Sequence, residues 1–519
     1  MDMNIFVVRQ RIGPSPQPNS VYLKEDSWDD FGFKTSFLLI AYNEDGVGSE
    51  LGTVKIGYVD QQFGRTAAHL PDVFSSLPDQ FFSLGQDPEY YKKMRDFLGE
   101  DRAIKLLAAL HDIALEDDRY QSLLAEPVIV KSLTRSISEF TIVKQFRRIM
   151  RTGVVLTDFD FRYSRPGSKT KAPIDLRFIV NAASTPPTNI HVLIGRNGVG
   201  KTSLLNDIVH VAALGSTDEQ KHGKLTSSDI FLTNNGLEQD YFSRVVSVSF
   251  SAFDPFVPPD LPKDGKRGIS YFYIGLKSGQ NSGLGSAYVP KRLDELRADC
   301  IDSIVACLRQ VERKKRWLEA ISRLQSDTNF EEFDLPSLAG IGIEEDLRGE
   351  AGKKFDAMSS GHALVLLTMS RLVETIEEKT LVLMDEPESH LHPPLLSAFT
   401  RALSDLLLKR NGVAIVATHS PVVLQEVPKM CAWKLWRSHL ESRADRPEGE
   451  TFGENVGILT REVFGLEVTK SGFLDMLTTS ALKGGSYEQI LGEYDGQLGF
   501  EARALLRALI TVRDSKEGR

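Results

Sequence analysis

The sequence predicts an α/β fold with a parallel sheet, and three stretches carry that prediction. Each is a run of apolar residues, as in a buried parallel strand, that is followed directly by polar or glycine residues. The three stretches are His191–Asn206, Leu381–Pro387 and Ala414–Ser420. Because the carboxyl ends of parallel strands meet at one edge of a sheet, we expect the residues after these strands to form one site.

Composition and charge limit the class of protein. The chain has 519 residues, 41% of them hydrophobic, which is enough for about two to four domains with cores of their own. Its net charge of −9 argues against a protein that is basic overall and binds nucleic acid with its whole surface, although a local basic groove stays open. The sequence shows no apolar run of membrane-spanning length and no signal peptide, so we expect a cytoplasmic protein with no membrane contact.

The three cysteines show no metal-binding spacing. Cys300 and Cys307 lie seven residues apart in a helical pattern, so both are expected to face a core, and Cys431 stands alone. A reduced, cytosolic compartment is the simplest interpretation.

Residues 1–150 are expected to form an N-terminal α+β region with strands first and helices after them. The expected strands are Asn4–Arg9, Thr35–Tyr42 and Gly52–Val59, and the expected helices are Tyr90–Leu98, Arg102–Leu115 and Ser132–Met150. A short basic face near its end consists of Lys144, Arg147, Arg148 and Arg151. This face is either a solvated surface or a contact for nucleic acid or a partner.

Residues 151–437 are expected to form the nucleotide-binding core, with a helical insertion at about 258–350. Strands are predicted at Val154–Tyr163, Ile174–Asn181 and Arg244–Phe250, and residues 258–290 are predicted as a surface insertion. Phe161 and Tyr163 either pack in the core or stack on a base. Lys291–Leu324 is predicted as a long helix or helix pair, too short for an extended coiled coil. Its basic residues are assigned to the outer face, and they are Arg309, Arg313, Lys314, Lys315 and Arg316.

The first of the three stretches contains a phosphate-binding loop. Gly195, Gly198, Gly200, Lys201 and Thr202 form the pattern G-x-x-x-x-G-K-T between a strand and a helix. The glycines allow a tight turn whose N–H groups point at a phosphate chain, the lysine reaches the β- and γ-phosphates, and the threonine hydroxyl is a ligand for Mg²⁺. The whole predicted ATP-binding loop is Gly195, Arg196, Asn197, Gly198, Val199, Gly200, Lys201, Thr202 and Ser203.

The other two strands supply the residues for hydrolysis. Asp385 and Glu386 follow the second strand directly, so both carboxylates are expected beside the phosphate loop. Asp385 is predicted to hold Mg²⁺ together with Thr202, and Glu386 to polarise the attacking water. His419, after the third strand, is predicted to act with Glu386 as a second catalytic residue near the γ-phosphate.

A further motif, Met358–His362 with the sequence MSSGH, precedes an apolar helix at Ala363–Ile376. The order phosphate loop, MSSGH, Asp-Glu strand and His419 strand resembles that of the ATP-binding-cassette (ABC) ATPases over residues 195–420. This resemblance implies an ABC-type core with a mixed sheet flanked by helices, ATP and Mg²⁺ as cofactors, and ATP hydrolysis. It also implies that Ser359, Ser360 and Gly361 contact nucleotide on a second copy, so that ATP closes a head-to-tail homodimer or a higher homo-oligomer.

The sequence departs from that family in two places. The family's glutamine after the strand that follows the phosphate loop is missing, and Ser251 or Asp254 is a candidate to replace it. His362 stands where the signature usually ends in glutamine. The segment Glu388–Pro393 after the acids resembles the soluble AAA-type ABC ATPases of the SMC, RecF and overcoming-lysogenization-defect (OLD) kind. Within it, His390 and His392 are assigned a helix-entry and dimer-contact role, with a metal pair as the alternative.

Residues 438–519 are expected to be a charged linker and a small helical region. This tail contains no D-x-D pattern, which the Toprim nuclease domain of the OLD proteins requires. The stretches Phe452–Leu466 and Ser249–Phe256 resemble the PtuA ATPases of the Septu and retron-associated anti-phage systems. That resemblance implies a sensor or regulator ATPase whose turnover can be slow, with a separate HNH-type nuclease as partner and a retron reverse transcriptase with its RNA/DNA as a further partner. The alternatives are an SMC/RecF-like DNA-repair ATPase that contacts DNA directly and a nucleotide-gated scaffold with little turnover.

Overall fold

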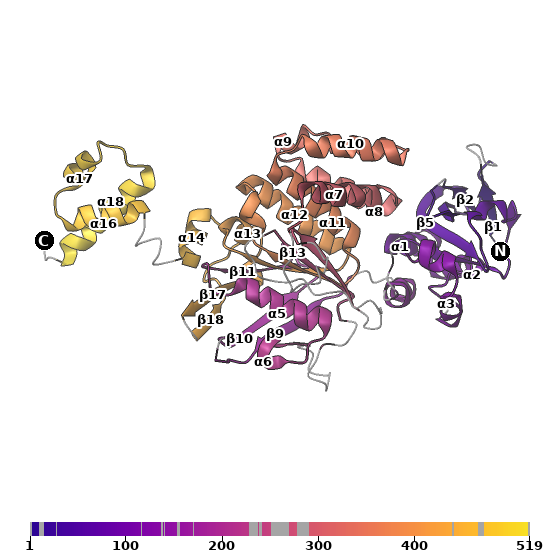
Figure 1. The fold of residues 1–519 in the computed structure, drawn as a ribbon, viewed down its shortest axis with the longest axis horizontal. Helices are drawn as coiled ribbons and strands as arrows, with labels where there is room; N and C mark the ends of the chain where they lie inside the picture. The colour runs from indigo at the N-terminus through magenta and orange to yellow at the C-terminus, as the bar shows by residue number, and fades with distance from the viewer. Residues whose placement is uncertain are drawn as a thin grey trace.

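The computed structural model describes residues 3–516 except for a set of short gaps. These gaps are residues 10–14, 27, 116, 136, 138, 140, 153–155, 170, 228–236, 238–240, 251–268, 278–289, 439–440 and 465–471. The described residues form an N-terminal sheet with its helices, a central α/β core and a C-terminal helical unit (Figure 1). No helix in the described ranges is long and apolar enough to cross a membrane.

The N-terminal part is built on a mixed sheet with the strand order β7-β1-β2-β4-β5-β8. The first two strands in the sequence pair in parallel, and the other neighbours run antiparallel. The strands are β1 (Asn4–Val8), β2 (Ser20–Glu25), β4 (Ser36–Tyr42), β5 (Gly48–Tyr58), β7 (Val73–Phe74) and β8 (Phe81–Gly85), and β3 (Phe33–Lys34) pairs separately with β6 (Gly64–Arg65).

Helices cover one side of this sheet and share a single apolar core with it. They are α1 (Pro88–Leu98), α2 (Glu100–Ala109), α3 (Asp117–Leu123) and α4 (Arg147–Thr152), with short turns η2 (Ile129–Leu133) and η3 (Thr141–Phe146). The prediction of one helix over Ser132–Met150 is wrong, because wide helical turns and irregular residues interrupt it. Strands β2 and β8 were not predicted.

The central core is a seven-stranded sheet in the order β14-β13-β15-β16-β11-β17-β18. All neighbours are parallel except the last pair. The strands are β11 (Ile190–Gly195), β13 (Arg244–Ser249), β14 (Ser270–Gly275), β15 (Thr380–Asp385), β16 (Val413–Thr418), β17 (Ala432–Ser438) and β18 (Glu441–Asp445). The predicted strands that carry the site are therefore neighbours, with β16 between β11 and β15.

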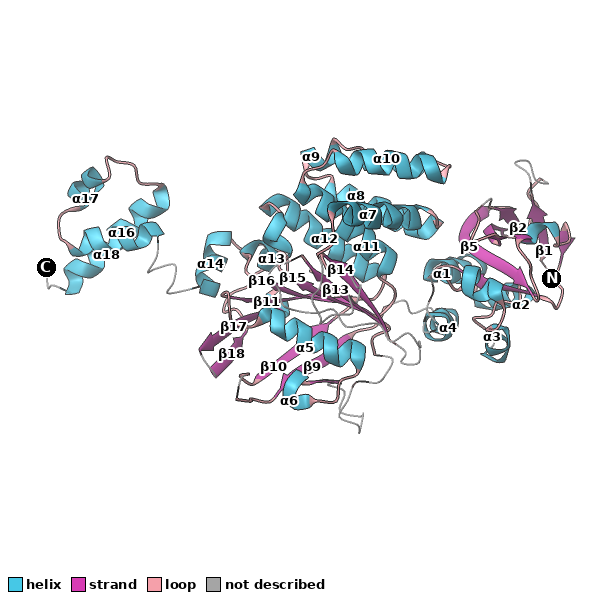
Figure 2. Cartoon of the chain, in the orientation of Figure 1, coloured by secondary structure: helices cyan, strands magenta, loops and turns pink. Residues whose placement is uncertain are grey.

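The two faces of this sheet have different covers (Figure 2). Val192 and Ile194 point to one side, where they join a core with the helices α7 (Leu293–Leu308), α8 (Val311–Leu324), α11 (Ser360–Thr375) and α12 (Pro393–Lys409). Leu193 points to the other side, onto α5 (Lys201–Leu214) and a small antiparallel sheet, β10-β9-β12. The small sheet contains β9 (Phe159–Arg165), β10 (Ile174–Val180) and β12 (Lys224–Ser227). This alternation is that of a strand buried on both faces.

The remaining elements connect the helices and strands named above. They are α6 (Glu219–His222), α9 (Thr328–Glu331), α10 (Glu344–Asp356) and α13 (Pro421–Gln425), with the turns η1 (Thr66–Ala68), η4 (Leu335–Gly340), η5 (Pro387–His390) and η6 (Lys429–Cys431). Cys300 and Cys307 are buried in the helical core, as predicted, and Cys431 is buried too.

Two parts of the predicted core differ from the structure. The surface insertion predicted at residues 258–290 contains β14, which forms an edge of the main sheet. The charged linker predicted from residue 438 contains β18, which pairs with β17. β14 (SYFYIG) is rich in strand-forming residues, but the Pro, Gly and Ser residues on both sides of it favour a surface loop. β18 (ESRAD) is polar and gains its stability from pairing with β17.

The C-terminal helices are α14 (Val456–Phe464), α16 (Gly472–Leu482), α17 (Tyr487–Glu493) and α18 (Phe500–Lys516). The last three share a small core of their own, with Ala481, Ile490 and Leu506 buried. In contrast, α14 packs on the central core, where Leu459 is buried.

Buried charged groups join the N-terminal part to the central core. Asp87, which caps α1, lies with its Oδ2 2.6 Å from Arg316 Nη1 on α8 and 3.4 Å from Arg410 Nη1 after α12. Arg148 forms an ion pair with the buried Glu378. Arg148 and Arg316 therefore do not belong to solvated basic faces, which corrects the prediction for these two residues.

Candidate nucleotide site

The phosphate loop connects β11 to α5. Gly198 (φ +81°) and Gly200 (φ +97°) adopt backbone conformations that favour glycine. At Gly195 a side chain would meet the Leu435 carbonyl oxygen at 2.4 Å, so β17 packs closely against the start of the loop. Glycine at these positions shapes a turn of backbone N–H groups ahead of the helix.

Lys201 lies at the first position of α5 and is buried. Its Nζ donates to the carbonyl oxygens of Gly195 at 2.9 Å and Arg196 at 3.3 Å. Burial lowers the pKa of Lys201, while the carboxylates of Glu386, Asp385 and Glu388 oppose that shift. The ammonium group is thus held inside the loop, next to three acidic groups.

Thr202 and Asp385 meet at the centre of the site. The Thr202 hydroxyl donates to Asp385 Oδ2 at 2.7 Å, although the two residues are 183 positions apart. The strand order explains the contact, because β15 ends at Asp385 two strands away from β11. A hydroxyl and a carboxylate are the oxygen ligands that Mg²⁺ prefers, so these residues fit the metal.

Two further acidic groups surround His419. Its Nδ1 lies 3.1 Å from Glu388 Oε1 and 3.6 Å from Glu386 Oε1. The contact between His419 Nδ1 and Glu388 Oε1 is short enough for an ion pair but does not have the angles of a hydrogen bond. Glu388 also accepts hydrogen bonds from the Thr418 hydroxyl and from the His419 N–H, both at 2.7 Å. Glu388 was not among the predicted site residues, and its only sequence signal is an acid two positions after Glu386.

Glu386 has a left-handed backbone conformation, with φ +46°. This conformation is costly for a non-glycine residue. Its N–H donates to the Ala417 carbonyl oxygen at 2.8 Å, which ties it to the end of β16. The turn therefore carries the Glu386 side chain towards His419.

A pocket of about 240 Å³ lies beside the phosphate loop. It is lined on one side by Val199, Gly200 and Ser203 of the loop and α5, and on the other by Trp436 and Arg437 of β17. Trp436 as a whole residue is 46% exposed, so part of its indole is accessible next to the loop. Sequence reasoning missed this residue, because nothing in the β17 sequence marks its position beside the loop.

Phe161 and Tyr163 do not line that pocket. Both are fully buried, and the Phe161 ring stacks on Phe178 with centroids 5.1 Å apart. The alternative that they stack on a base is therefore wrong, and they pack in the core.

The predicted signature lies at the N-terminus of α11. The Ser359 side chain caps the helix and its Oγ lies 2.7 Å from His362 Nδ1. Ser360 is exposed. At Gly361 a side chain would meet the His390 carbonyl oxygen at 2.6 Å, so the signature packs closely against the turn that follows the acids. No hydrogen bond or ion pair joins Ser359, Ser360 or Gly361 to the phosphate loop of the same described chain.

The histidine after the signature belongs to a group with Asp327 and His392. Asp327 Oδ1 lies 3.4 Å from His362 Nε2, at hydrogen-bond distance, and Asp327 Oδ2 lies 3.0 Å from His392 Nε2 as an ion-pair contact. The three residues have the types and spacing of metal ligands, with ligand atoms within 4.8 Å of one another. However, His392 Nδ1 accepts from the Leu395 N–H to cap α12. That bond places the ring proton on Nε2, the nitrogen that faces Asp327, and a protonated nitrogen cannot bind a metal ion. His390 is outside this group.

The candidates for the missing glutamine and the contact of the phosphate loop with α14 complete the description of the site. Ser251 and Asp254, the candidates for the missing glutamine, lie outside the described residues. Arg196 of the phosphate loop donates through Nη2 to the Phe464 carbonyl oxygen at 3.2 Å, so the loop contacts the end of α14.

Two comparisons with known proteins bear on the family of this chain. A family model described as "AAA domain, putative AbiEii toxin, Type IV TA system" matches residues 299–425. Protein ea59 of Escherichia phage lambda is 43% identical over 529 aligned residues, which cover 98% of each chain.

Several solved structures are similar at low identity. An ATP-binding cassette of an ABC transporter in its ADP conformation is 14% identical, with 60% of this chain and 100% of that chain covered and a TM-score of 0.31. UvrA2 from Deinococcus radiodurans is 15% identical, with 59% and 40% covered and a TM-score of 0.29. The SmcHead bound to the C-winged helix domain of ScpA is 13% identical, with 56% and 97% covered and a TM-score of 0.27.

The TM-scores of these solved structures are too low to carry weight. The strand order and the Thr202–Asp385 contact describe the core of a P-loop ATPase of the AAA/ABC type. The extent and identity of the match to the phage protein fix the family of the whole chain. The chain belongs to the family of protein ea59 of Escherichia phage lambda.

Proposed function

We propose that this chain binds and hydrolyses ATP, closes as a head-to-tail dimer when ATP is bound, and uses that change to regulate a partner. The observation that carries the proposal is the convergence of Lys201, Thr202 and Asp385, with Glu386 and His419 on the same edge of the sheet. A site with a buried ammonium group, a hydroxyl–carboxylate pair and a carboxylate beside a histidine has the parts that phosphoryl transfer to water requires.

Each residue has a defined task in this mechanism. Lys201 and the N–H groups of the loop bind the β- and γ-phosphates, while Thr202 and Asp385 hold Mg²⁺, which offsets the charge of the phosphates. Glu386 orients the water and takes its proton as the water oxygen bonds to the γ-phosphorus. The bond to the β–γ bridging oxygen then breaks, and ADP is the leaving group. His419, held by Glu388, donates a hydrogen bond to the transferred phosphate.

The pocket beside the loop supplies a place for the nucleoside. Because Ser203 follows the phosphate-binding residues on α5, the adenosine is expected to extend towards Trp436. Stacking of a base on the exposed indole would contribute about 1–3 kcal/mol.

Two substitutions test the enzyme. Lys201→Ala should abolish ATP binding in a nucleotide-binding assay, while Lys315→Ala, an exposed lysine on α8, should leave it unchanged. Glu386→Gln should retain ATP and trap the closed dimer without turnover, while Glu345→Gln on the exposed first turn of α10 should turn over normally. Normal ATP affinity in the first variant, or undiminished hydrolysis in the second, would remove these residues from their proposed roles.

The partner is proposed from the resemblance of Phe452–Leu466 and Ser249–Phe256 to the PtuA ATPases. That resemblance supports an HNH-type nuclease as the regulated subunit, with a retron reverse transcriptase and its RNA/DNA as a further component. The contact between Arg196 and the end of α14 offers a path from the nucleotide to this tail. Affinity purification from the natural host, with ATP and with ADP, should recover such a nuclease in one nucleotide state. Its absence in both states would contradict the nuclease-regulator role.

Direct DNA binding by the basic faces is less well supported. Of the residues predicted to carry it, Arg316 pairs with Asp87, Arg148 pairs with Glu378, and Arg313 is buried. Side chains with these neighbours cannot line up on a DNA backbone without separating the N-terminal part from the core.

A further inference from the structure

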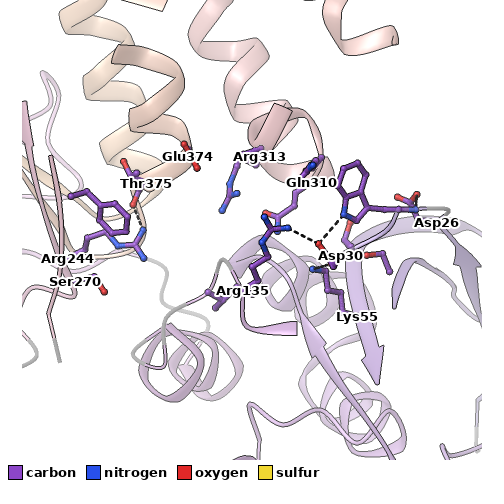
Figure 3. A pocket seen from close by; sticks show the side chains of 17 residues that line it. Asp26, Asp30, Lys55, Arg135, Arg244, Ser270, Gln310, Arg313, Glu374 and Thr375 are labelled. Atoms are coloured by element: carbon purple, nitrogen blue, oxygen red, sulfur yellow. Dashed lines mark hydrogen bonds and ion pairs between the residues drawn. The ribbon is translucent and has the colours of Figure 1, made fainter. Parts of the chain in front are cut away.

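A cavity of about 370 Å³ lies where the N-terminal sheet meets the central core (Figure 3). The N-terminal part contributes Asp30, Lys55 and Arg135 to its wall, and the core contributes Arg244 and Arg313, among other residues. None of the phosphate-loop residues lines it, so the cavity is separate from the nucleotide site.

Arg313, near the start of α8, points into this cavity (Figure 3). It is only 9% exposed. Among the described residues it makes no hydrogen bond or ion pair, and its Nε is buried without a partner. Burial lowers its pKa, and the charges that oppose this shift include Glu374 and Glu377.

Neither of those two glutamates is free to neutralise Arg313. Glu374 Oε2 lies 2.9 Å from Arg371 Nη1, and Glu377 Oε1 lies 3.1 Å from Arg244 Nη2. A buried guanidinium group without a paired anion is unfavourable, because a protein interior solvates charge poorly. An anion bound next to Arg313 would therefore lower the free energy of the folded protein, and the cavity that its side chain faces has room for one.

The other charged residues of the wall do not meet this need. The buried Asp30 is already bound by Lys55 at 2.6 Å and by Arg135 at 3.4 Å. Arg309 stacks on Trp28, 4.2 Å from the ring centroid, and pairs with Glu344. The wall contains five basic residues and three acidic ones. Arg244 and Arg309 are already paired with Glu377 and Glu344, which lie outside the wall, so among the described residues only Arg313 of the five basic ones makes no ion pair. The basic residues are Lys55, Arg135, Arg244, Arg309 and Arg313, and the acidic ones are Asp26, Asp30 and Glu374.

These features match a phosphate group. A guanidinium group binds phosphate through two parallel hydrogen bonds, and a phosphate offers more acceptor oxygens to the surrounding donors than a carboxylate does. Hydroxyl groups of Ser36, Thr53 and Ser270 add donors around the same space. The volume is at the lower end of small-molecule sites.

We propose that this cavity binds a small phosphorylated ligand, whose phosphate group pairs with Arg313 and bridges the N-terminal part and the ATPase core. The phosphate is either inorganic or part of a nucleotide, and both carry the same recognised group. Because the ligand contacts both parts, its binding stabilises their junction.

The test uses the full-length chain with Lys201→Ala, so that the phosphate loop does not contribute to binding. Inorganic phosphate, pyrophosphate and AMP are titrated separately while thermal unfolding and tryptophan fluorescence are followed. Trp28 lines the cavity, so Trp28→Phe should remove the binding-dependent change in fluorescence and keep the rise in melting temperature. Tighter binding of AMP than of the inorganic anions identifies a nucleotide ligand, and equal binding identifies the inorganic anion.

Arg313→Met should weaken binding by at least about tenfold. Without ligand it should melt at the same or a higher temperature, because it removes a buried unpaired charge. Arg313→Lys keeps the positive charge but loses the paired N–H donors of the guanidinium group, so it should bind with intermediate affinity. It also replaces the methionine variant in the test if that variant does not fold. Arg323→Met is the matched control, since that arginine lies on the same helix with its side chain 63% exposed. Failure of every probe to bind the parent protein, or equal binding by the Arg313 variants and the parent, would overturn the proposal.

Discussion

Gly361→Ala should greatly reduce ATP hydrolysis, which needs the signature, and leave ATP binding by the phosphate loop intact. The added Cβ would lie 2.6 Å from the His390 carbonyl oxygen, whereas ordinary contact begins at 3.4 Å. Because a backbone carbonyl cannot rotate away as a side chain does, the first turn of α11 or the His390 turn must move by about 0.8 Å. A displacement of about 1 Å at a catalytic group can reduce turnover by about a hundredfold. ATP binding to one copy should persist, because Lys201 and Thr202 are not affected.

Mixing variants tests whether the signature acts on a second copy. The Gly361→Ala variant has an intact phosphate loop but an impaired signature, and the Lys201→Ala variant has the reverse. Each variant alone should therefore be inactive, because every site in its homodimer lacks one intact half. In a head-to-tail heterodimer of the two, one site combines both intact halves. After random exchange of equal amounts, the ATPase rate should reach about a quarter of that of the unsubstituted protein.

The control is Gly349→Ala on α10, where an added Cβ meets nothing within 4 Å. This variant should keep full turnover. A mixture of the two inactive variants that stays as inactive as each alone, after subunit exchange has been demonstrated, would refute the head-to-tail site. Full turnover by Gly361→Ala alone would refute the structural reasoning about the signature.

Two further predictions concern the site and the sheet. Glu388→Gln should lower kcat by about 10- to 100-fold with little change in ATP affinity, because it weakens the hold on His419 rather than the phosphate loop; an unchanged kcat in a steady-state ATPase assay would contradict this. Burial, with a smaller effect of Arg446, lowers the pKa of His191 to about 3, so the unfolded chain binds more protons than the folded chain between pH 3 and pH 6.5. The unfolding free energy should therefore fall by about 2 kcal/mol between pH 7.5 and pH 5 through this group. His191→Leu should lose that part of the pH dependence in urea unfolding, and parallel profiles for the two proteins would contradict the assignment.

The residues at the strand ends could be placed from the sequence because local patterns mark them. The apolar run before Asp385 and the glycine turn before Lys201 each define a strand and its end. Parallel pairing then brings residues 183 positions apart into contact, as the Thr202–Asp385 hydrogen bond shows. Glu388 and Trp436 could not be placed in this way, because their positions depend on how a turn and a neighbouring strand pack.

The basic residues of α8 show a different limit of sequence reasoning. A polar helix face is exposed to solvent only when no other part of the protein packs against it. Here the face of α8 lies against the N-terminal part, which supplies Asp87 for Arg316 and a cavity for Arg313. The short strand β8 was missed for a related reason, since β5 and the helices around it determine its conformation.

The Asp87 contact limits how this protein can have been assembled from parts. Arg316 lies on α8 and Arg410 directly follows α12, and one carboxylate from the N-terminal part pairs with both. An ATPase core without residues 1–150 would keep both guanidinium groups but lose the carboxylate that pairs with them. We therefore expect a chimaera with an exchanged N-terminal part to keep this junction only when an acid before α1 meets both arginines of the core.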